Sequence, residues 1–171
     1  MKKFELTSEF VTFLGKKLFR IKALISFGNV EEGELGGYVE KEENLSNDGN
    51  AWVYGNARVY GNARVYGDAE VFGNARVYGN ARVYGNAEVF GNARVYGNAD
   101  YATVHGFGSE YRTTTFFRTK AGDIGVRCGC FYGTLEEFRA KVKETHGETK
   151  TAKEYLMVAD LMEFRFSKEE A

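Results

Sequence analysis

A six-residue motif, Ala-x-Val-(Tyr or Phe)-Gly-(Asn or Asp), repeats eight times without a gap between Ala51 and Asn98. A fixed short period is the signature of a solenoid, in which each repeat buries its apolar face against its neighbours. Alanine and valine stand two residues apart, as at Ala57 and Val59, so both point to one side of a strand while Arg58 points outward. Gly-Asn then supplies a corner, because both residues tolerate left-handed backbone angles. The motif therefore predicts short strands separated by tight corners.

The hexads that depart from the consensus indicate how many sides the coil has. The outward position holds arginine in most hexads, but it holds Trp52, Glu70 and Glu88 in the other three, at a spacing of 18 residues. Only the two glutamate hexads also replace tyrosine by phenylalanine, at Phe72 and Phe90. Three hexads per turn place all of these exceptions on one side. We therefore expect a triangular prism of stacked parallel strands.

The chain divides by pattern into three segments. Residues 1–38 alternate apolar and polar positions, which predicts a small antiparallel β cap over the first coil, whose open edge needs cover. Residues 39–105 form the coils, with Val39 and Leu45 already in the register of the hexad alanines. Residues 106–171 predict a ββαα element, which either caps the last coil or mediates oligomerisation and binding.

The ββαα prediction depends on local signals after the repeats end. Residues 111–119 and 124–132 have the pattern of a hairpin around the turn at 120–123. Thr134 and Glu137 then have the spacing of a capping box, with apolar residues on one helical face behind them. Gly147 ends that helix, and a second helix carries apolar residues at helical spacing between Ala152 and Met162.

The repeats resemble the hexapeptide-repeat left-handed β-helix family. The flanking segments 35–46, 128–134 and 144–147 are similar to uncharacterised bacterial, phage or prophage proteins that are sometimes labelled polymer-forming or acyltransferase-like. The resemblance implies a left-handed coil and side-to-side packing into oligomers, but no settled activity. The expected fold class is thus mainly β, a short left-handed triangular parallel β-helix with an N-terminal β cap and a C-terminal ββαα element.

Composition limits the function classes. The formal net charge of −1 over 171 residues gives no overall case for binding nucleic acid or a membrane surface. The first residues lack the apolar core of a signal peptide, and no segment reaches the length of a membrane span. The two cysteines, two residues apart, suggest reduced thiols rather than a disulfide framework. We predict a cytoplasmic protein without membrane contact.

Few residues qualify for a catalytic role. Acyltransferases of the resembled class use a histidine that projects from the coil region, and His105 just after the coils is the candidate general base. Its alternative reading is a loop residue at the exit of the prism. The family's extended coil loop, which helps to shape the acyl-donor site, has no counterpart in the uninterrupted hexads. The sequence therefore favours a protein without catalysis.

A metal site has one candidate set. Cys128 and Cys130 are expected on the same side of a strand, and with His146 they supply three ligands, one short of a closed zinc site. The alternative is two partly buried thiols packed on the helices. No metal or cofactor is predicted.

The outer faces of the prism carry the candidate binding residues. Stacking at a spacing of 18 aligns arginines with one another and tyrosines with one another on two of the three faces. These residues are Arg58, Arg76 and Arg94 with Tyr60, Tyr78 and Tyr96, and on a second face Arg64 and Arg82. Arginine forks onto phosphate oxygens and tyrosine stacks on bases, so the combination suits an anionic partner. The alternative is a solvated face copied by repeat duplication.

Three functions remain open. The first is a non-catalytic binding protein of phage or prophage type that occupies a host protein, with inhibition of a host defence component as its role. The second is sequestration of a small anionic ligand such as a nucleotide, and the third is acyl transfer with His105 as base. We favour the first, and we expect a homo-oligomer, a trimer or a dimer, because few coils bury little core.

Overall fold

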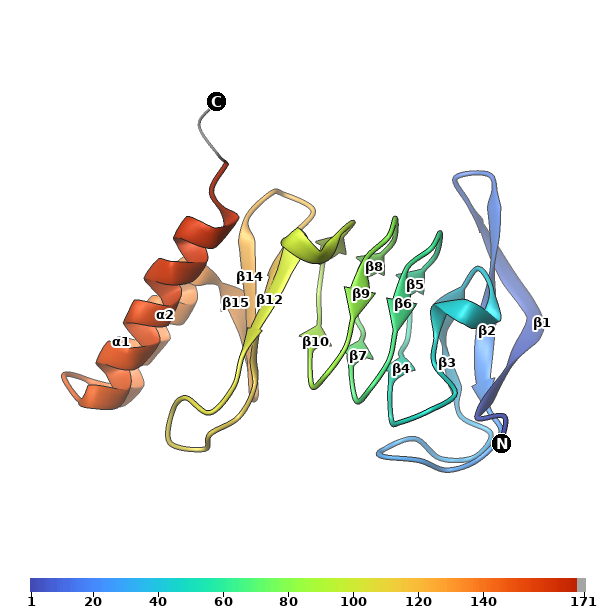
Figure 1. Ribbon diagram of the computed structural model, residues 1–171, viewed down its shortest axis with the longest axis horizontal. Coiled ribbons are helices and arrows are strands. Elements are labelled where there is room, and N and C mark those ends of the chain that lie inside the picture. The colour runs from blue at the N-terminus through green and yellow to red at the C-terminus, as the bar shows by residue number, and fades with distance from the viewer. Residues whose placement is uncertain (169–171) are drawn as a thin grey trace. The chain divides into compact units, whose positions relative to one another are not determined.

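The computed structural model describes residues 1–168. The chain forms two compact units, which divide between Asn98 and Ala99. The first contains the hexads and the second contains the helices (Figure 1).

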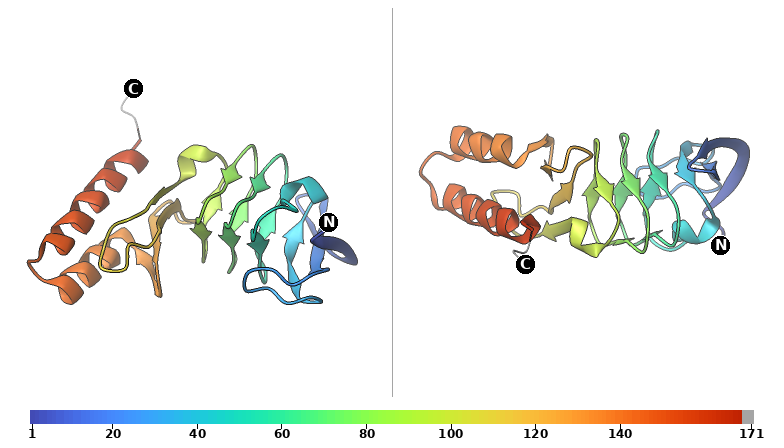
Figure 2. Two further views of the ribbon diagram at one scale, coloured as in Figure 1. Left: turned by 60° about the horizontal axis from the view of Figure 1, so that its bottom comes forward. Right: turned by 90° about the horizontal axis from the view of Figure 1, so that it is seen from above.

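Each hexad forms one short strand. The eight strands are β4 (Trp52–Val53), β5 (Arg58–Val59), β6 (Arg64–Val65), β7 (Glu70–Val71), β8 (Arg76–Val77), β9 (Arg82–Val83), β10 (Glu88–Val89) and β11 (Arg94–Val95). Every pairing among them is parallel and joins residues 18 apart, in the orders β4-β7-β10, β5-β8-β11 and β6-β9. The coils stack in line in all views (Figures 1 and 2). The predicted solenoid with three strands per turn is confirmed, and its left hand stays a prediction.

The inside of the coil is made of the hexad alanines and valines, all of which are at most 1% exposed. The glycines at the fifth position of the first seven hexads adopt positive φ, as at Gly61 (67°) and Gly79 (64°), which makes the corners. Backbone N–H groups of one coil donate to carbonyls of the next, as from Arg58 N to Ala75 O at 3.0 Å. Because each coil bonds only its neighbours, the two ends of the stack need other partners.

The first coil differs from the register expected from the sequence. The first coil begins with β3 (Leu35–Val39). Val39 pairs with Val59 and Leu45 with Val65, whereas the sequence predicted pairing with Ala57 and Ala63. The offset arises because the corner at residues 46–51 is longer than a hexad corner. A shift of two residues keeps the same side of the strand inward. Val39 and Leu45 are accordingly buried, at 0% and 2% exposure.

An antiparallel hairpin precedes the first coil, as predicted. Its strands are β1 (Phe4–Phe13) and β2 (Lys16–Ala23), joined at Leu14 and Gly15, both of which have positive φ. Strand β2 pairs with β3, so that one sheet runs in the order β1-β2-β3-β5-β8-β11. The hairpin therefore extends one face of the prism beyond the first coil.

Buried polar side chains cap the carbonyls at this end of the stack. Lys3, 1% exposed, donates from Nζ to Ala51 O at 2.9 Å and to Gly49 O at 3.2 Å. Asn44, in the short 3₁₀ helix η1 (Glu42–Asn44), donates from Nδ2 to Ala63 O at 2.9 Å and to Gly61 O at 3.1 Å. Lys3 takes the place of a missing preceding coil, and Asn44 of the first coil supplies donors to the next coil. Buried carbonyls without a donor would destabilise the fold.

The second unit is an antiparallel sheet with two helices packed on one face (Figures 1 and 2). After the 3₁₀ turn η2 (Asn98–Asp100), its elements are β12 (Tyr101–Val104), β13 (Thr114–Arg118), β14 (Ile124–Cys128), β15 (Phe131–Thr134), α1 (Leu135–His146) and α2 (Lys150–Phe166). The sheet order is β12-β13-β14-β15. Thr134 and Glu137 form the expected capping box, and Gly147 caps the end of α1.

The predicted hairpin and two helices are present, with two differences in the strands. Residues 101–104, expected in the coils, pair with β13 instead. The single strand expected over 124–132 is split by a tight turn, because Gly129 adopts φ of 59° and Cys128 pairs with Phe131. Within residues 1–168, neither helix combines the length and the apolar character needed to cross a bilayer.

Candidate functional site

Three arginines form a continuous row on the face made by β5, β8 and β11. Arg58 pairs with Arg76, and Arg76 with Arg94, at matching positions of adjacent strands. We call Arg58, Arg76 and Arg94 the arginine ladder. All three side chains are half-buried rather than fully solvated. The predicted alignment of these residues is therefore confirmed, and their environment is less open than the sequence suggested.

Phe13 of the N-terminal hairpin covers two of the three arginines. The ring centroid of Phe13 lies 4.7 Å from Cζ of Arg58 and 4.4 Å from Cζ of Arg76, so one aromatic ring contacts two guanidinium groups. The same ring meets Tyr60 edge-on at 5.5 Å. Sequence reasoning missed Phe13, because it precedes the turn of a hairpin and nothing in its local pattern indicates a contact with residue 58.

A row of tyrosines runs beside the ladder along one corner of the prism. Tyr60 and Tyr78 stack at 5.2 Å with an interplanar angle of 11°, and Tyr78 and Tyr96 follow at 5.3 Å and 57°. Exposure rises along this row, from 7% at Tyr60 to 64% at Tyr96. Burial, and then the neighbouring Tyr78, raises the pKa of Tyr60. The row is thus buried at Tyr60, near the N-terminal hairpin, and exposed at Tyr96, in the last hexad.

The ladder carries positive charge that no described carboxylate neutralises in an ion pair. In the part that the structure describes, none of its three arginines forms an ion pair with a carboxylate. Burial, and then repulsion from Arg76, lowers the pKa of Arg94. The Arg94 guanidinium donates to the backbone carbonyls Ala93 O at 2.9 Å and Asn74 O at 3.0 Å. Like charges on strands about 4.8 Å apart repel by roughly 1 kcal/mol even at the dielectric of water.

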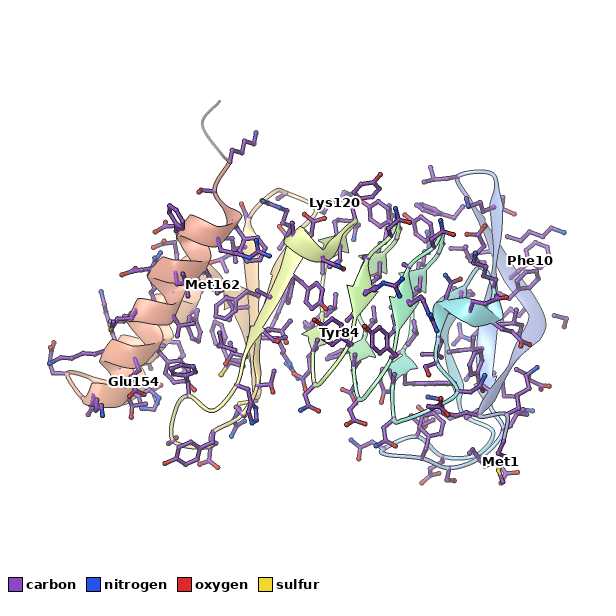
Figure 3. The ribbon with its side chains drawn as sticks, viewed as in Figure 1. Met1, Phe10, Tyr84, Lys120, Glu154 and Met162 are labelled. Carbon is purple, nitrogen blue, oxygen red and sulfur yellow. The ribbon has the colours of Figure 1, made fainter. Side chains whose placement is uncertain are left out.

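The second arginine face differs from the first in exposure. Arg64 and Arg82 occupy matching positions of β6 and β9, and both are exposed. Tyr66 and Tyr84 stack beside them at 5.2 Å and 14°. Tyr84 is exposed and lies among the coils, apart from the N-terminal hairpin (Figure 3).

A cavity of about 560 Å³ lies next to Arg64 on this face. Lys41 and Arg64 line it, but so do the carboxylates of Glu42, Glu43 and Asp48. Acidic groups therefore outnumber basic ones, and the cavity is not suited to a small anion.

The third face is acidic and partly covered. Glu70 pairs with Glu88 on one side and with Trp52 on the other, as the spacing of 18 predicts. Trp52 occupies the outward position of its hexad but is not exposed to solvent, because Phe4 and Phe27 pack against the indole at 6.3 and 5.3 Å and leave it 0% exposed. The hairpin and the segment after it thus cover this face at the first coil.

His105 lies in the exposed loop that follows β12. Its Nδ1 is 3.0 Å from Thr113 Oγ1. A hydroxyl is a weaker orienting partner for a general base than a carboxylate. The surroundings of His105 therefore supply no specific support for acyl transfer.

Cys128, Cys130 and His146 line one cavity of about 260 Å³ in the second unit, together with Tyr155. Cys128 Sγ accepts a hydrogen bond from Thr114 Oγ1 at 3.2 Å and lies 3.8 Å from the Tyr155 hydroxyl. Burial, and then Cys128, raises the pKa of Tyr155 to about 12. The split of the strand at Gly129 leaves Cys130 exposed in the turn and not beside Cys128 on a strand.

The predicted ligand set thus shares a cavity without forming a metal centre. Among residues 1–168, no group of three or more histidine, cysteine, aspartate or glutamate side chains is arranged to hold a metal ion.

Comparison with known proteins identifies the repeats. Residues 51–67, 57–73, 69–85 and 75–89 match the family described as the YdcK beta-solenoid repeat. A comparison with curated proteins found no match. The matched segments coincide with β4 to β10, so sequence comparison and strand pairing agree that the chain contains a repeat-type β-solenoid.

Proposed function

We propose that the protein is a non-catalytic binding module and that the arginine ladder binds an acidic surface of a protein partner. The observation that carries the proposal is the row of three half-buried arginines without a carboxylate partner among the described residues. The three aligned guanidinium groups repel one another, which is unfavourable in the free protein. Carboxylates of a partner would attract them and make the electrostatic energy of the ladder favourable.

The shape of the face favours a protein over a small ligand. Small ligands are usually enclosed in concave pockets, whereas the ladder lies on the surface of a parallel sheet. The cavity beside Arg64 contains more acidic than basic groups. Tyrosine and arginine are also the residues enriched at the centres of protein interfaces.

The resemblance to phage and prophage proteins supplies the class of partner. We infer that the partner is a host protein and that occupying it inhibits a host defence component. Nucleotide sequestration is the second candidate, because the open end of the tyrosine row places Tyr96, 64% exposed, beside Arg94.

The test compares affinity capture from host lysate by three forms of the full chain. The double variant Arg58→Glu/Arg76→Glu reverses the ladder, and Lys120→Glu/Lys143→Glu makes the same charge change at exposed lysines of the second unit. A partner held by the wild type and the control, and lost by the ladder variant and at high salt, supports the proposal. Equal capture by all three forms refutes it.

Two measurements complete the test. Fluorescence of Trp52, the only tryptophan, verifies that the ladder variant retains a folded solenoid. Native mass spectrometry of the wild type with a nucleotide mixture addresses the second candidate. A retained nucleotide that Arg94→Glu abolishes would favour sequestration over protein binding.

A further inference from the structure

The outward side of α2 carries three large apolar residues that are mostly exposed. Met157 is 70% exposed, Leu161 56% and Phe164 79%. Their spacing of four and three residues places them on one stripe of the helix. The stripe lies opposite the side that packs into the core, which is formed by Ala152, Tyr155, Val158, Ala159, Met162 and Phe166. Monomeric surfaces rarely leave such a row open, and rows of this spacing are how one helix binds another.

Two unpaired charges flank the stripe. Glu154 and Arg165 are 11 residues apart, about three helical turns, so they lie on the same side of the stripe near its two ends. Among the described residues neither forms an ion pair. Figure 3 shows Glu154 toward one end of α2 and on the side away from the sheet.

The other two acidic residues of this helix are already engaged across the helix pair, whereas Lys150 and Lys153 form no ion pair among the described residues. Arg139 of α1 binds Asp160 at 2.9 Å and Glu163 at 3.0 Å. Glu154 is thus the acidic residue of α2 without an ion pair among the described residues, and Arg165 is the basic residue near the other end of the stripe.

We propose that the stripe is the contact between two copies of this chain, with the two α2 helices antiparallel about a twofold axis near Leu161. A twofold axis between antiparallel helices brings the same side of each helix together. Leu161 then meets Leu161 of the second copy, and Met157 meets Phe164. Glu154 of each copy lies opposite Arg165 of the other, which gives two symmetric ion pairs.

The charges of Glu154 and Arg165 fit this arrangement. Antiparallel helices also align their dipoles favourably, with each N-terminus beside a C-terminus. A parallel pair would bring Arg165 toward Asp160 and Glu163, which Arg139 already holds. Asp160 lies near the proposed axis, but its ion pair with Arg139 offsets the repulsion between the two copies.

The experiment measures the mass of the full chain by sedimentation equilibrium over a range of concentrations. The wild type is expected to dimerise, and Leu161→Glu to be a monomer with an unchanged circular dichroism spectrum. Glu154→Arg and Arg165→Glu each bring like charges together and are expected to weaken the dimer about tenfold. The double variant Glu154→Arg/Arg165→Glu restores opposite signs and is expected to recover wild-type affinity.

The control is Lys153→Glu, which changes one charge on α2 outside the proposed pairs. A monomeric wild type overturns the proposal, as does an oligomer that Leu161→Glu leaves intact. A double variant that dimerises no better than either single variant overturns the antiparallel pairing. This proposal is independent of the arginine ladder, since no ladder residue belongs to α2.

Discussion

The buried Lys3 makes the stability of the solenoid depend on pH. Burial lowers the pKa of Lys3 from 10.5 to about 8, although Asp48 and Asp68 act to raise it. The unfolded chain therefore binds more protons than the folded one between these two values, and stability rises with pH in that window. Below about pH 8 the folded protein holds a charged ammonium group in the end of the coil. Replacing Lys3 with methionine removes this dependence.

The size of the effect follows from the two pKa values. With 10.5 unfolded and about 8 folded, linkage predicts that Lys3 adds about 2 kcal/mol to the free energy of unfolding between pH 7 and pH 9.5. Lys3→Met also leaves the carbonyls of Gly49 and Ala51 without this donor, at about 1–3 kcal/mol each at every pH. The difference in stability between wild type and variant should thus grow by about 2 kcal/mol over this range.

The assay is urea unfolding followed by the fluorescence of Trp52, which lies in the same unit and packs beside Phe27. The Lys3 ammonium nitrogen lies 4.6 Å from the centroid of the same Phe27 ring. Lys2→Met is the matched control, because Lys2 is exposed and its ion pair with Glu42 contributes little. Parallel stability curves for wild type and Lys3→Met across the pH range would refute the reasoning.

Three further substitutions test the fold. Asn44→Ala should lower the free energy of unfolding of the solenoid by at least about 2 kcal/mol, because two carbonyls of the next coil lose their donor, whereas Asn62→Ala at an exposed corner should have little effect. Alanine at Gly79 or at Gly85 introduces the same left-handed backbone strain of about 1–2 kcal/mol. At Gly79 the new Cβ would also lie 2.5 Å from the carbonyl oxygen of Tyr96, whereas at Gly85 it would meet no atom within 4 Å. Gly79→Ala should therefore unfold at a clearly lower urea concentration than Gly85→Ala. Thr134→Ala removes the capping box of α1 and should destabilise the second unit by about 1 kcal/mol, measured by thermal melting of the helical circular dichroism signal.

The repeats could be predicted almost completely because the interaction that builds them is local and periodic. Each hexad contains its inward pair, its outward residue and its corner, so the pairing of Arg58 with Arg76 follows from counting. The capping box at Thr134 was predictable for the same reason, since its two partners are three residues apart. These features need no knowledge of contacts between distant segments.

The first coil shows where this kind of prediction ends. The longer corner at residues 46–51 displaced the register of Val39, and no periodicity spans that corner. Trp52 occupies an outward position of a hexad but is buried by Phe4 and Phe27, residues from outside the repeats. Lys3 likewise reads as an ordinary surface residue near a terminus. Its role depends on carbonyls 46 and 48 residues away.

The thiols illustrate a different limit. Cys128, Cys130 and His146 do line one cavity, so their grouping was predictable from the topology of a hairpin followed by a helix. Their mutual geometry was not, because it depends on the turn at Gly129, where a positive φ reverses the chain between the two cysteines. Two residues of spacing bring side chains together only if the strand continues.

Contacts from outside the repeats also make the two arginine faces different. The hexads of Arg58 and Arg64 are nearly identical, and yet Arg58 is half-buried beneath Phe13 whereas Arg64 is exposed. The difference comes from the hairpin, which extends one sheet of the prism and leaves the other arginine face uncovered. The repeat thus supplies equivalent rows of charge, and the flanking segments make them chemically distinct. Phe13→Ala should therefore alter partner binding at the ladder while leaving the Arg64 face unchanged.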